Sequence, residues 1–271
     1  YVKNFLEDIA WPLTIDPILS TSLVIGCPAS VCEDQNAPLL GGEFGTGIAT
    51  GILSPGTGCS TCSATKPSVV VGVPLINVNN GFTNRGGIVI FTQNATNQLV
   101  FDSFHPMATG CGQDVAIGDV HGTADNDIIV GCPLSTGVEN GVRDGVLQVH
   151  DGPGFSGGFS GTVRLVVDPF NALLTEDRHL GMDFEVGYVT NDSKADIVAT
   201  TEFHHGGEAD RKVLRYNLLV SEDAVVEGTL PLEESNGSPF SFHTTLLNID
   251  RNAFVDVVIG HPNGVRVFLG S

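Results

Sequence analysis

The sequence predicts an all-β protein built as an array of similar units, and three observations support this. First, one spacing recurs, in which marker residues stand seven and nineteen places after an opening residue: Gly112, Asp119 and Gly131; Gly181, Tyr188 and Thr200; Ser241, Asn248 and Gly260. Second, 34 Gly and 14 Pro separate short Val/Ile-rich runs, as in chains of strands and turns. Third, the intervals between Gly26, Gly72, Gly131, Thr200 and Gly260 are 46, 59, 69 and 60 residues. Periods of this length indicate a radial or solenoidal array whose units cannot bury their cores alone.

Each clear unit is expected to hold four strands. In the best copy they are Val115–Asp119, Asp127–Gly131, Gly145–His150 and Thr162–Val167. The second strand is a continuous apolar run, which is typical of a strand covered on both faces by neighbouring sheets. Further third strands are expected at Ile88–Phe91, Val213–Tyr216 and Val265–Phe268.

Two more copies are weaker. Phe44-Gly45 opens one whose turn is replaced by an insertion, Ser54 to Pro67, before the run Val69–Pro74. Leu23–Pro28 closes another near the start of the chain.

The repeated patterns resemble the FG-GAP repeat of integrin alpha subunits and related extracellular β-propellers. The resemblance rests on Gly-x-x-Val-Ala-x-Gly-Asp, then Asp-x-x-Val-Gly-x-Pro, then Gly-x-Val-x-Val, and only Phe44-Gly45 keeps the name-giving dipeptide. It implies one β-propeller domain over residues 1–271, with four-stranded antiparallel blades at about 1–43, 44–110, 111–179, 180–239 and 240–271. Three arrangements stay open: a closed five-bladed ring in which the termini complete one blade, part of a seven-bladed ring, or a ring completed by another chain.

The resemblance also implies calcium loops between the first and second strands. A loop of the pattern Asp-x-Asp/Asn-x-Asp-Gly-x-x-Asp places oxygens around one cation. The best candidate ligands are Asn248, Asp250, Asn252 and Asp256, although Ala253 and Arg251 depart from the pattern. Asp119 and Asp127 form a weaker candidate, because His121 and Thr123 stand at ligand positions; Tyr188 to Asp196 is expected to be empty. The alternative is that these residues only bond the backbone of a hairpin turn.

The six cysteines favour disulfides and an oxidising compartment. Cys111 precedes the first strand of its unit and Cys132 follows the second, so the two are neighbours in an antiparallel hairpin. Cys27–Cys32 and Cys59–Cys62 are then local loop bridges, with a zinc or redox pair as the rival for Cys59 and Cys62. Asn94, in the sequon Asn94-Ala95-Thr96, is the best candidate for glycosylation.

Composition limits the classes of partner. Twelve Lys and Arg against 31 Asp and Glu give a formal net charge of −19, which disfavours nucleic acid and anionic lipid. No apolar run reaches the roughly 18 residues of a membrane span. Cations, neutral glycans and protein partners remain.

No catalytic residue is assigned. Residues 152–158 match the letters of a Gly-x-Gly-x-x-Gly and of a Gly-x-Ser-x-Gly pattern, but they belong to a glycine-rich turn expected between the third and fourth strands, not to a strand-to-helix turn. The sequence contains no phosphate-loop pattern. His204-His205, near Glu202, Glu208 and Asp210, is a lesser zinc candidate beside a solvated loop.

The expected function is therefore that of an extracellular, non-catalytic binding or assembly module, calcium-stabilised, which mediates protein–protein interaction or adhesion as part of a surface assembly. The irregular stretches Pro28–Glu43 and Ser54–Pro67 are the expected contact regions. A carbohydrate-binding lectin is the alternative, and a polysaccharide-active enzyme on the same scaffold is the second alternative.

Overall fold

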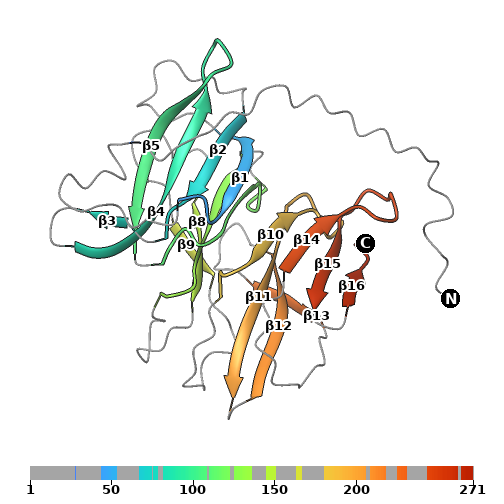
Figure 1. Ribbon diagram of the computed structural model, residues 1–271. Coiled ribbons are helices and arrows are strands. Elements are labelled where there is room, and N and C mark those ends of the chain that lie inside the picture. The colour runs from blue at the N-terminus through green and yellow to red at the C-terminus, as the bar shows by residue number, and fades with distance from the viewer. Residues whose placement is uncertain are drawn as a thin grey trace, which may run out of the picture.

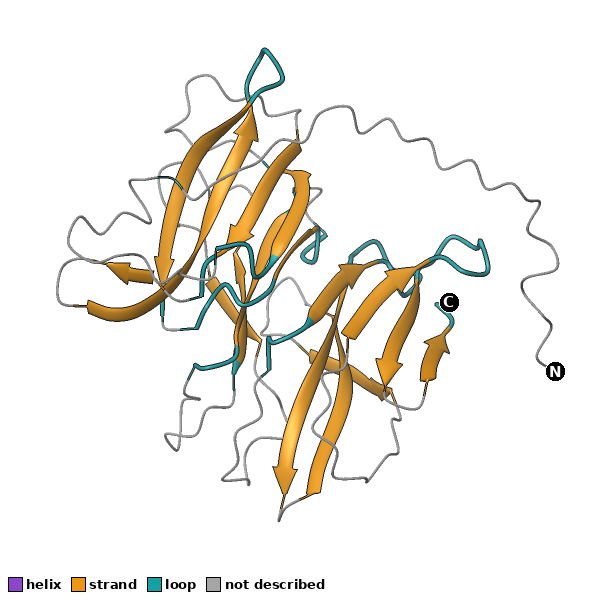
Figure 2. Cartoon of the chain, viewed as in Figure 1, coloured by secondary structure: helices purple, strands orange, loops and turns teal. Residues whose placement is uncertain are grey.

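The computed structural model describes residues 28, 44–53, 67–74, 76–78, 82–108, 110–122, 125–135, 145–150, 163–166, 180–205, 208–217, 225–230, 243–261 and 264–270 (Figure 1). Within these ranges the chain forms strands and no helix (Figure 2). The sequence-based prediction of an all-β protein is confirmed at this level.

The strands form four antiparallel sheets. The first contains β1 (Ile48–Ile52), β2 (Pro67–Gly72), β3 (Ile76–Val78), β4 (Phe82–Gln93) and β5 (Leu99–Met107), with β3 and β5 both paired to the long strand β4. The second contains β6 (Val115–Gly118), β7 (Asp127–Cys132), β8 (Val146–His150) and β9 (Val163–Val166). The third contains β10 (Phe184–Gly187), β11 (Asp196–His205), β12 (Glu208–Asn217) and β13 (Val225–Leu230). The fourth contains β14 (His243–Leu247), β15 (Asp256–His261) and β16 (Gly264–Phe268).

This order agrees with the strand assignment made from the sequence. β6 to β9 coincide with the four strands expected in the best unit, and the expected third strands lie within β4, β12 and β16. The short strand β3, which pairs with the start of β4, was not expected. The described sheets do not close into a ring, and the unit expected at 1–43 lies outside the described residues except for Pro28.

The second strand of the second sheet, β7, is buried because a sheet packs on each of its faces. All six residues of β7 are buried. Ile128 and Val130 join a cluster that includes Val70 of the first sheet, whereas Ile129 joins Ile197 of the third sheet. The core therefore consists of apolar layers between neighbouring sheets, so each unit depends on the next for burial.

Glycines explain the recurring spacing. The opening residues Gly45, Gly112 and Gly181 have φ values of 91°, 93° and 96°, a region that residues with a Cβ rarely adopt. Gly131, nineteen places after Gly112, lies against the backbone of the next unit, because a Cβ there would overlap the carbonyl oxygen of Gly181. Gly72 and Gly112 make the same close approach.

The first strands of neighbouring units also lie side by side, and a glycine in one receives a side chain of the next. A Cβ on Gly118, six places after its opening residue, would lie 2.5 Å from Val186 Cγ1. The pairs Gly51–Ile117 and Gly187–Leu246 repeat this contact at 2.5 Å and 2.7 Å. We call these three glycines the socket glycines. They fix β1, β6, β10 and β14 in one consecutive series.

Candidate functional site: a row of hairpin loops

Three nine-residue loops join the first and second strands of the second, third and fourth sheets. They are residues 119–127, 188–196 and 248–256, and we call them the loop row (Figure 2). In the first loop, residues 123 and 124 lie outside the described part. These loops contain the metal ligands predicted from the sequence.

The last residue of every loop is an aspartate that holds the loop from within. Asp196 Oδ2 accepts hydrogen bonds from the backbone N–H groups of Val189 and Thr190, both at 3.0 Å, and from Thr190 Oγ1 at 3.0 Å. Asp127 accepts from the amides of residues 120 and 121 at 3.0 and 3.2 Å, and Asp256 from those of residues 249 and 250 at 2.6 and 3.4 Å. All three aspartates are at most 1% exposed. In all three loops, a buried carboxylate accepts hydrogen bonds from backbone amides that the turn would otherwise leave without a partner.

Each loop is also joined to its neighbour. The backbone N–H of Ala195, at loop position eight, donates to the carbonyl of Asp119, at position one of the preceding loop, at 2.9 Å. Val255 donates in the same way to the carbonyl of Tyr188 at 2.9 Å. In the first loop, the side-chain Nδ2 of Asn126, also at position eight, donates to the carbonyl of Ile52 at the end of β1, at 3.0 Å. The loop row is therefore a continuous hydrogen-bonded rim.

The loop 248–256 contains the best predicted calcium ligands, and its polar atoms bond one another. Asp250 Oδ1 accepts from the N–H of Asn252 at 3.0 Å, and Asp250 Oδ2 accepts from Asn252 Nδ2 at 3.0 Å. Asn248 Nδ2 donates to the carbonyl of Asn252 at 2.5 Å. Asp256 Oδ1 accepts from the N–H of Gly270 at 3.0 Å. Oxygens at the four predicted positions are thus present, and all four residues bond atoms within the loop.

These bonds also affect ionisation. Hydrogen bonds from the amides of Gly270 and Ile249 hold the pKa of Asp256 below its usual range. Asp256 is therefore a carboxylate at neutral pH, the form that either a cation or backbone amides require.

The weaker candidate, Asp119 with Asp127, has a different neighbour. His121 Nδ1 lies 3.0 Å from Asp127 Oδ2, and both side chains are buried. The histidine therefore lies against the carboxylate that the calcium prediction assigns as a ligand. Among the described residues, no three His, Cys, Asp or Glu side chains gather in a way that could hold a metal ion.

Two further aspartates, which the sequence reasoning missed, link neighbouring units beneath the loop row. Asp114 Oδ2 accepts from the N–H of Phe184 at 3.1 Å. Asp183 Oδ2 accepts from the N–H and Oγ1 of Thr244 at 2.7 and 2.6 Å. Both aspartates stand two places after an opening glycine and bind the residue three places into the next unit. This shared offset was visible in the sequence, whereas the partners of the two aspartates were not.

Burial raises the pKa values of the acids at this junction. Burial raises the pKa of Asp114 to about 6, with a further contribution from the charge of Asp183. Burial, and then the charges of Asp114 and Asp183, raises the pKa of Glu185 to about 7. Asp114 and Glu185 therefore change protonation state near neutral pH.

Two buried histidines were also missed. His105 on β5 has its Nε2 2.7 Å from Ser103 Oγ, and burial lowers its pKa to about 4. Burial, followed by the proximity of His105, lowers the pKa of His150 to about 3. Both are neutral at pH 7. The side chains of His204 and His205, the lesser zinc candidate of the sequence analysis, lie outside the described part of the chain.

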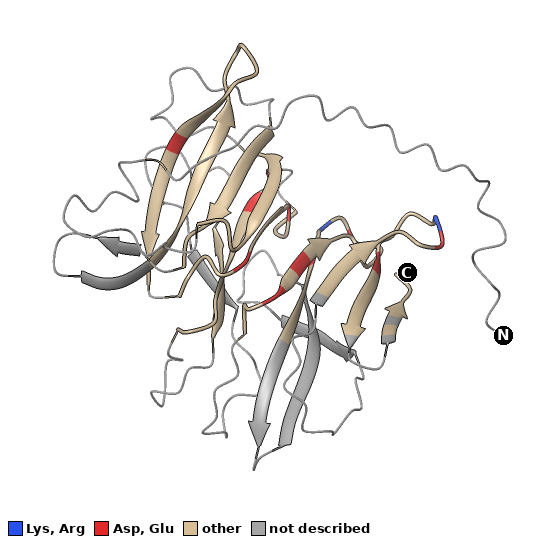
Figure 3. Ribbon diagram, viewed as in Figure 1, with Lys and Arg blue, Asp and Glu red and all other residues tan. Residues whose placement is uncertain are grey.

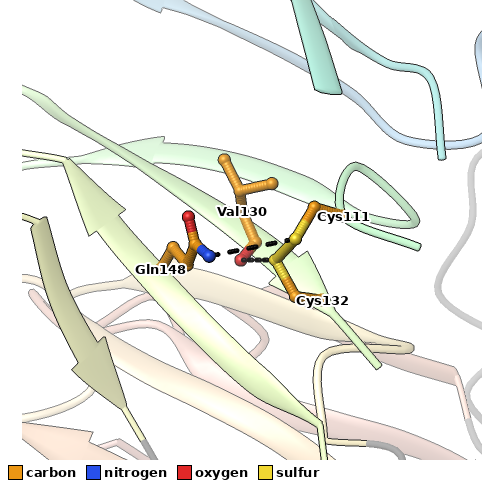
Figure 4. Close-up of a disulfide and its surroundings, with 4 residues drawn as sticks. All are labelled: Cys111, Val130, Cys132 and Gln148. Carbon is orange, nitrogen blue, oxygen red and sulfur yellow. Dashed lines mark hydrogen bonds between the residues drawn. A yellow bond between two sulfur atoms is a disulfide. The ribbon is translucent and has the colours of Figure 1, made fainter. Parts of the chain in front are cut away.

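The disulfide joins Cys111 to Cys132, the pair selected by the hairpin argument (Figure 4). Both cysteines are fully buried, and Gln148 Nε2 lies 3.9 Å from Cys111 Sγ. The other predicted pairs, Cys27–Cys32 and Cys59–Cys62, lie outside the described residues.

Asn94 lies in the turn between β4 and β5, next to exposed residues. Its Oδ1 accepts from the N–H and Oγ1 of Thr96 at 3.0 and 2.8 Å. The sequon is therefore at a surface turn, and its glycosylation stays a prediction.

Comparison of the chain with protein-family models and with curated proteins gave no match. In the described ranges, no helix is long and apolar enough to cross a membrane.

Proposed function

We propose that this protein is an extracellular, non-catalytic β-propeller module that binds a protein partner through the loop row, in adhesion or in a surface assembly. The resemblance to FG-GAP repeats supports the propeller, and the consecutive packing of β1, β6, β10 and β14 is compatible with blades arranged about an axis. The buried disulfide is compatible with an oxidising compartment.

The observation that carries the binding proposal is the hydrogen-bonded loop row. Loops fixed by buried aspartates and by bonds to their neighbours lose little conformational entropy when a partner binds. Exposed on this rim are Tyr188, at 46%, and Ile249, at 37%, beside polar side chains. Such a mixture of an aromatic residue, an aliphatic residue and polar groups is typical of protein interfaces.

The loop row carries basic side chains, although the chain as a whole is acidic. Among the residues whose side chains are described, Asp and Glu outnumber Lys and Arg, and the basic ones are Lys194 and Arg251, in two loops of the row (Figure 3). Each cation offers a pairing group for an acidic side chain of a partner, which favours orientation more than affinity.

Calcium is the proposed ligand of the loop 248–256. Asp250 and Asp256 supply two carboxylates, Asn248 and Asn252 supply amide oxygens, and carboxylate oxygens can accept a cation beside an existing hydrogen bond. An ion there stiffens the end of the loop row. The lectin and polysaccharide-enzyme alternatives have no specific observation in their favour.

The binding proposal is tested with the immobilised full chain against a panel of extracellular-matrix proteins and cell surfaces. We expect Tyr188→Ser to weaken binding by about tenfold, as for loss of an aromatic anchor. Met182→Ser is the matched control, because Met182 is 50% exposed but precedes β10, whereas Tyr188 follows its end. Equal binding by both variants, or turnover of a polysaccharide by the chain, contradicts the proposal.

A further inference from the structure

The fourth sheet presents one open apolar face. Val258 pairs with Val267, and alternation along the strands places Leu247 of β14 and Val265 of β16 on the same side. Leu247, Val265, Val267 and the adjoining Leu269 are 57%, 66%, 45% and 62% exposed. A contiguous aliphatic surface of this kind marks a contact site.

The opposite face of the same sheet is covered. Val257 and Ile259 are at most 1% exposed and pack with Val198 of the third sheet. Leu246 fills the socket at Gly187. One face of the fourth sheet is therefore covered and the other is open. In each of the first three sheets, the next sheet of the same chain packs on the corresponding face.

The first strand of the fourth sheet departs from the socket rule at this face. Six places after its opening residue stands Leu247, where the other units have the socket glycines Gly51, Gly118 and Gly187. The element that covers this face therefore receives a projecting leucine instead of inserting a side chain into a socket.

A second copy of the chain is a poor cover, because two chains of net charge −19 repel each other. The aliphatic patch itself contains no charge to pair with a charged partner.

One stretch of this chain has the second-strand pattern but no described unit around it: Leu23-Val24-Ile25-Gly26-Cys27-Pro28. It matches Val69–Pro74 and the run from Asp256 to Pro262, which are central to their own sheets.

We propose that the segment Leu23–Gly26 packs on the open face of β14–β16, against Leu247 and Val267. Residues 1–43 exceed in length the span 243–268 that forms the whole fourth sheet, so the segment can bring flanking strands with it. The contact extends the series of sheet junctions by the same apolar layering seen between the described sheets. It does not depend on the partner proposed for the loop row.

The test is site-specific thiol labelling of the full chain, read by peptide mass mapping so that each cysteine is followed separately. Val267→Cys reports on the open face, and Ala95→Cys, in the exposed β4–β5 turn, is the control. We expect Val267→Cys to react about tenfold more slowly than the control, since labelling requires the segment to detach.

Adding Val24→Asp or Ile25→Asp identifies the covering element. Alternation points one of these side chains at the face, and a buried aspartate there has no partner. One of the two substitutions is expected to raise the labelling rate of Val267→Cys to that of the control. Val24→Ala and Ile25→Ala replace the aspartate variants if either of those fails to fold. Fast labelling of Val267→Cys alone, insensitivity to all four changes, or protection that rises with protein concentration would overturn the assignment.

Discussion

Asp196 illustrates how a single residue maintains one unit. Its side chain is 1% exposed and accepts hydrogen bonds from two backbone amides and one hydroxyl of its own loop. Removing the carboxylate leaves both amides without that partner in a buried site. An unsatisfied buried donor costs about 1–3 kcal/mol, and more when the lost partner was charged.

We therefore expect Asp196→Ala to lower the free energy of unfolding by about 3 kcal/mol, measured by urea denaturation. Asp192→Ala is the control in the same loop, because Asp192 is exposed, and its carboxylate accepts a bond from the N–H of Lys194 at 2.9 Å. It is expected to cost under about 1 kcal/mol. Similar losses for the two variants would contradict the buried-anchor role of Asp196.

At the scale of elements, the strands were predictable because their causes are local. The apolar run in β7 is short, rich in β-branched residues and bounded by turn residues, which together indicate a buried strand. The cysteine pair followed from the hairpin itself, since Cys111 and Cys132 flank its two strands.

The contacts between units were less accessible from the sequence. The link from Asp114 to Phe184 spans 70 residues, and nothing local to Asp114 indicates its partner. His121 was assigned as a poor calcium ligand by residue type, but its position against Asp127 depends on how the loop folds. The calcium prediction rests on loop composition. The same Asp and Asn residues suit either a loop that binds a cation or a turn that forms hydrogen bonds within itself.

The loop 248–256 gives the prediction at this scale. If calcium binds, the native state is stabilised by mass action, by about 2.7 kcal/mol at a free concentration one hundredfold above Kd. We expect calcium to raise the thermal midpoint of the full chain and Asp250→Asn to remove that response. Asp192→Asn, a change of the same kind in loop 188–196, is expected to keep it. A midpoint insensitive to both calcium and a chelator contradicts the proposed ligand.

For the whole molecule, two groups of buried or half-buried residues make opposing contributions to stability as pH changes. Asp114 and Glu185 have raised pKa values, of about 6 and about 7, so the folded chain binds more protons than the unfolded chain. Their contribution is complete at low pH and is lost as pH rises through those values. His105 and His150 have pKa values lowered to about 4 and about 3, so their contribution is lost as pH falls below 6.5.

Because the two contributions oppose each other between pH 4 and 7, the wild-type chain is expected to show a shallow profile there, and single substitutions separate the terms. Glu185→Gln removes an acid that is costly to ionise, so the variant gains stability relative to wild type as pH rises from 5 to 8. The gain is about 1–2 kcal/mol, reduced by solvent screening because the side chain is only half-buried. His150→Gln is expected to show the reverse trend, gaining relative to wild type as pH falls from 7 to 5. Urea unfolding of the three chains at each pH measures both slopes; parallel profiles would show that neither junction titrates as its burial requires.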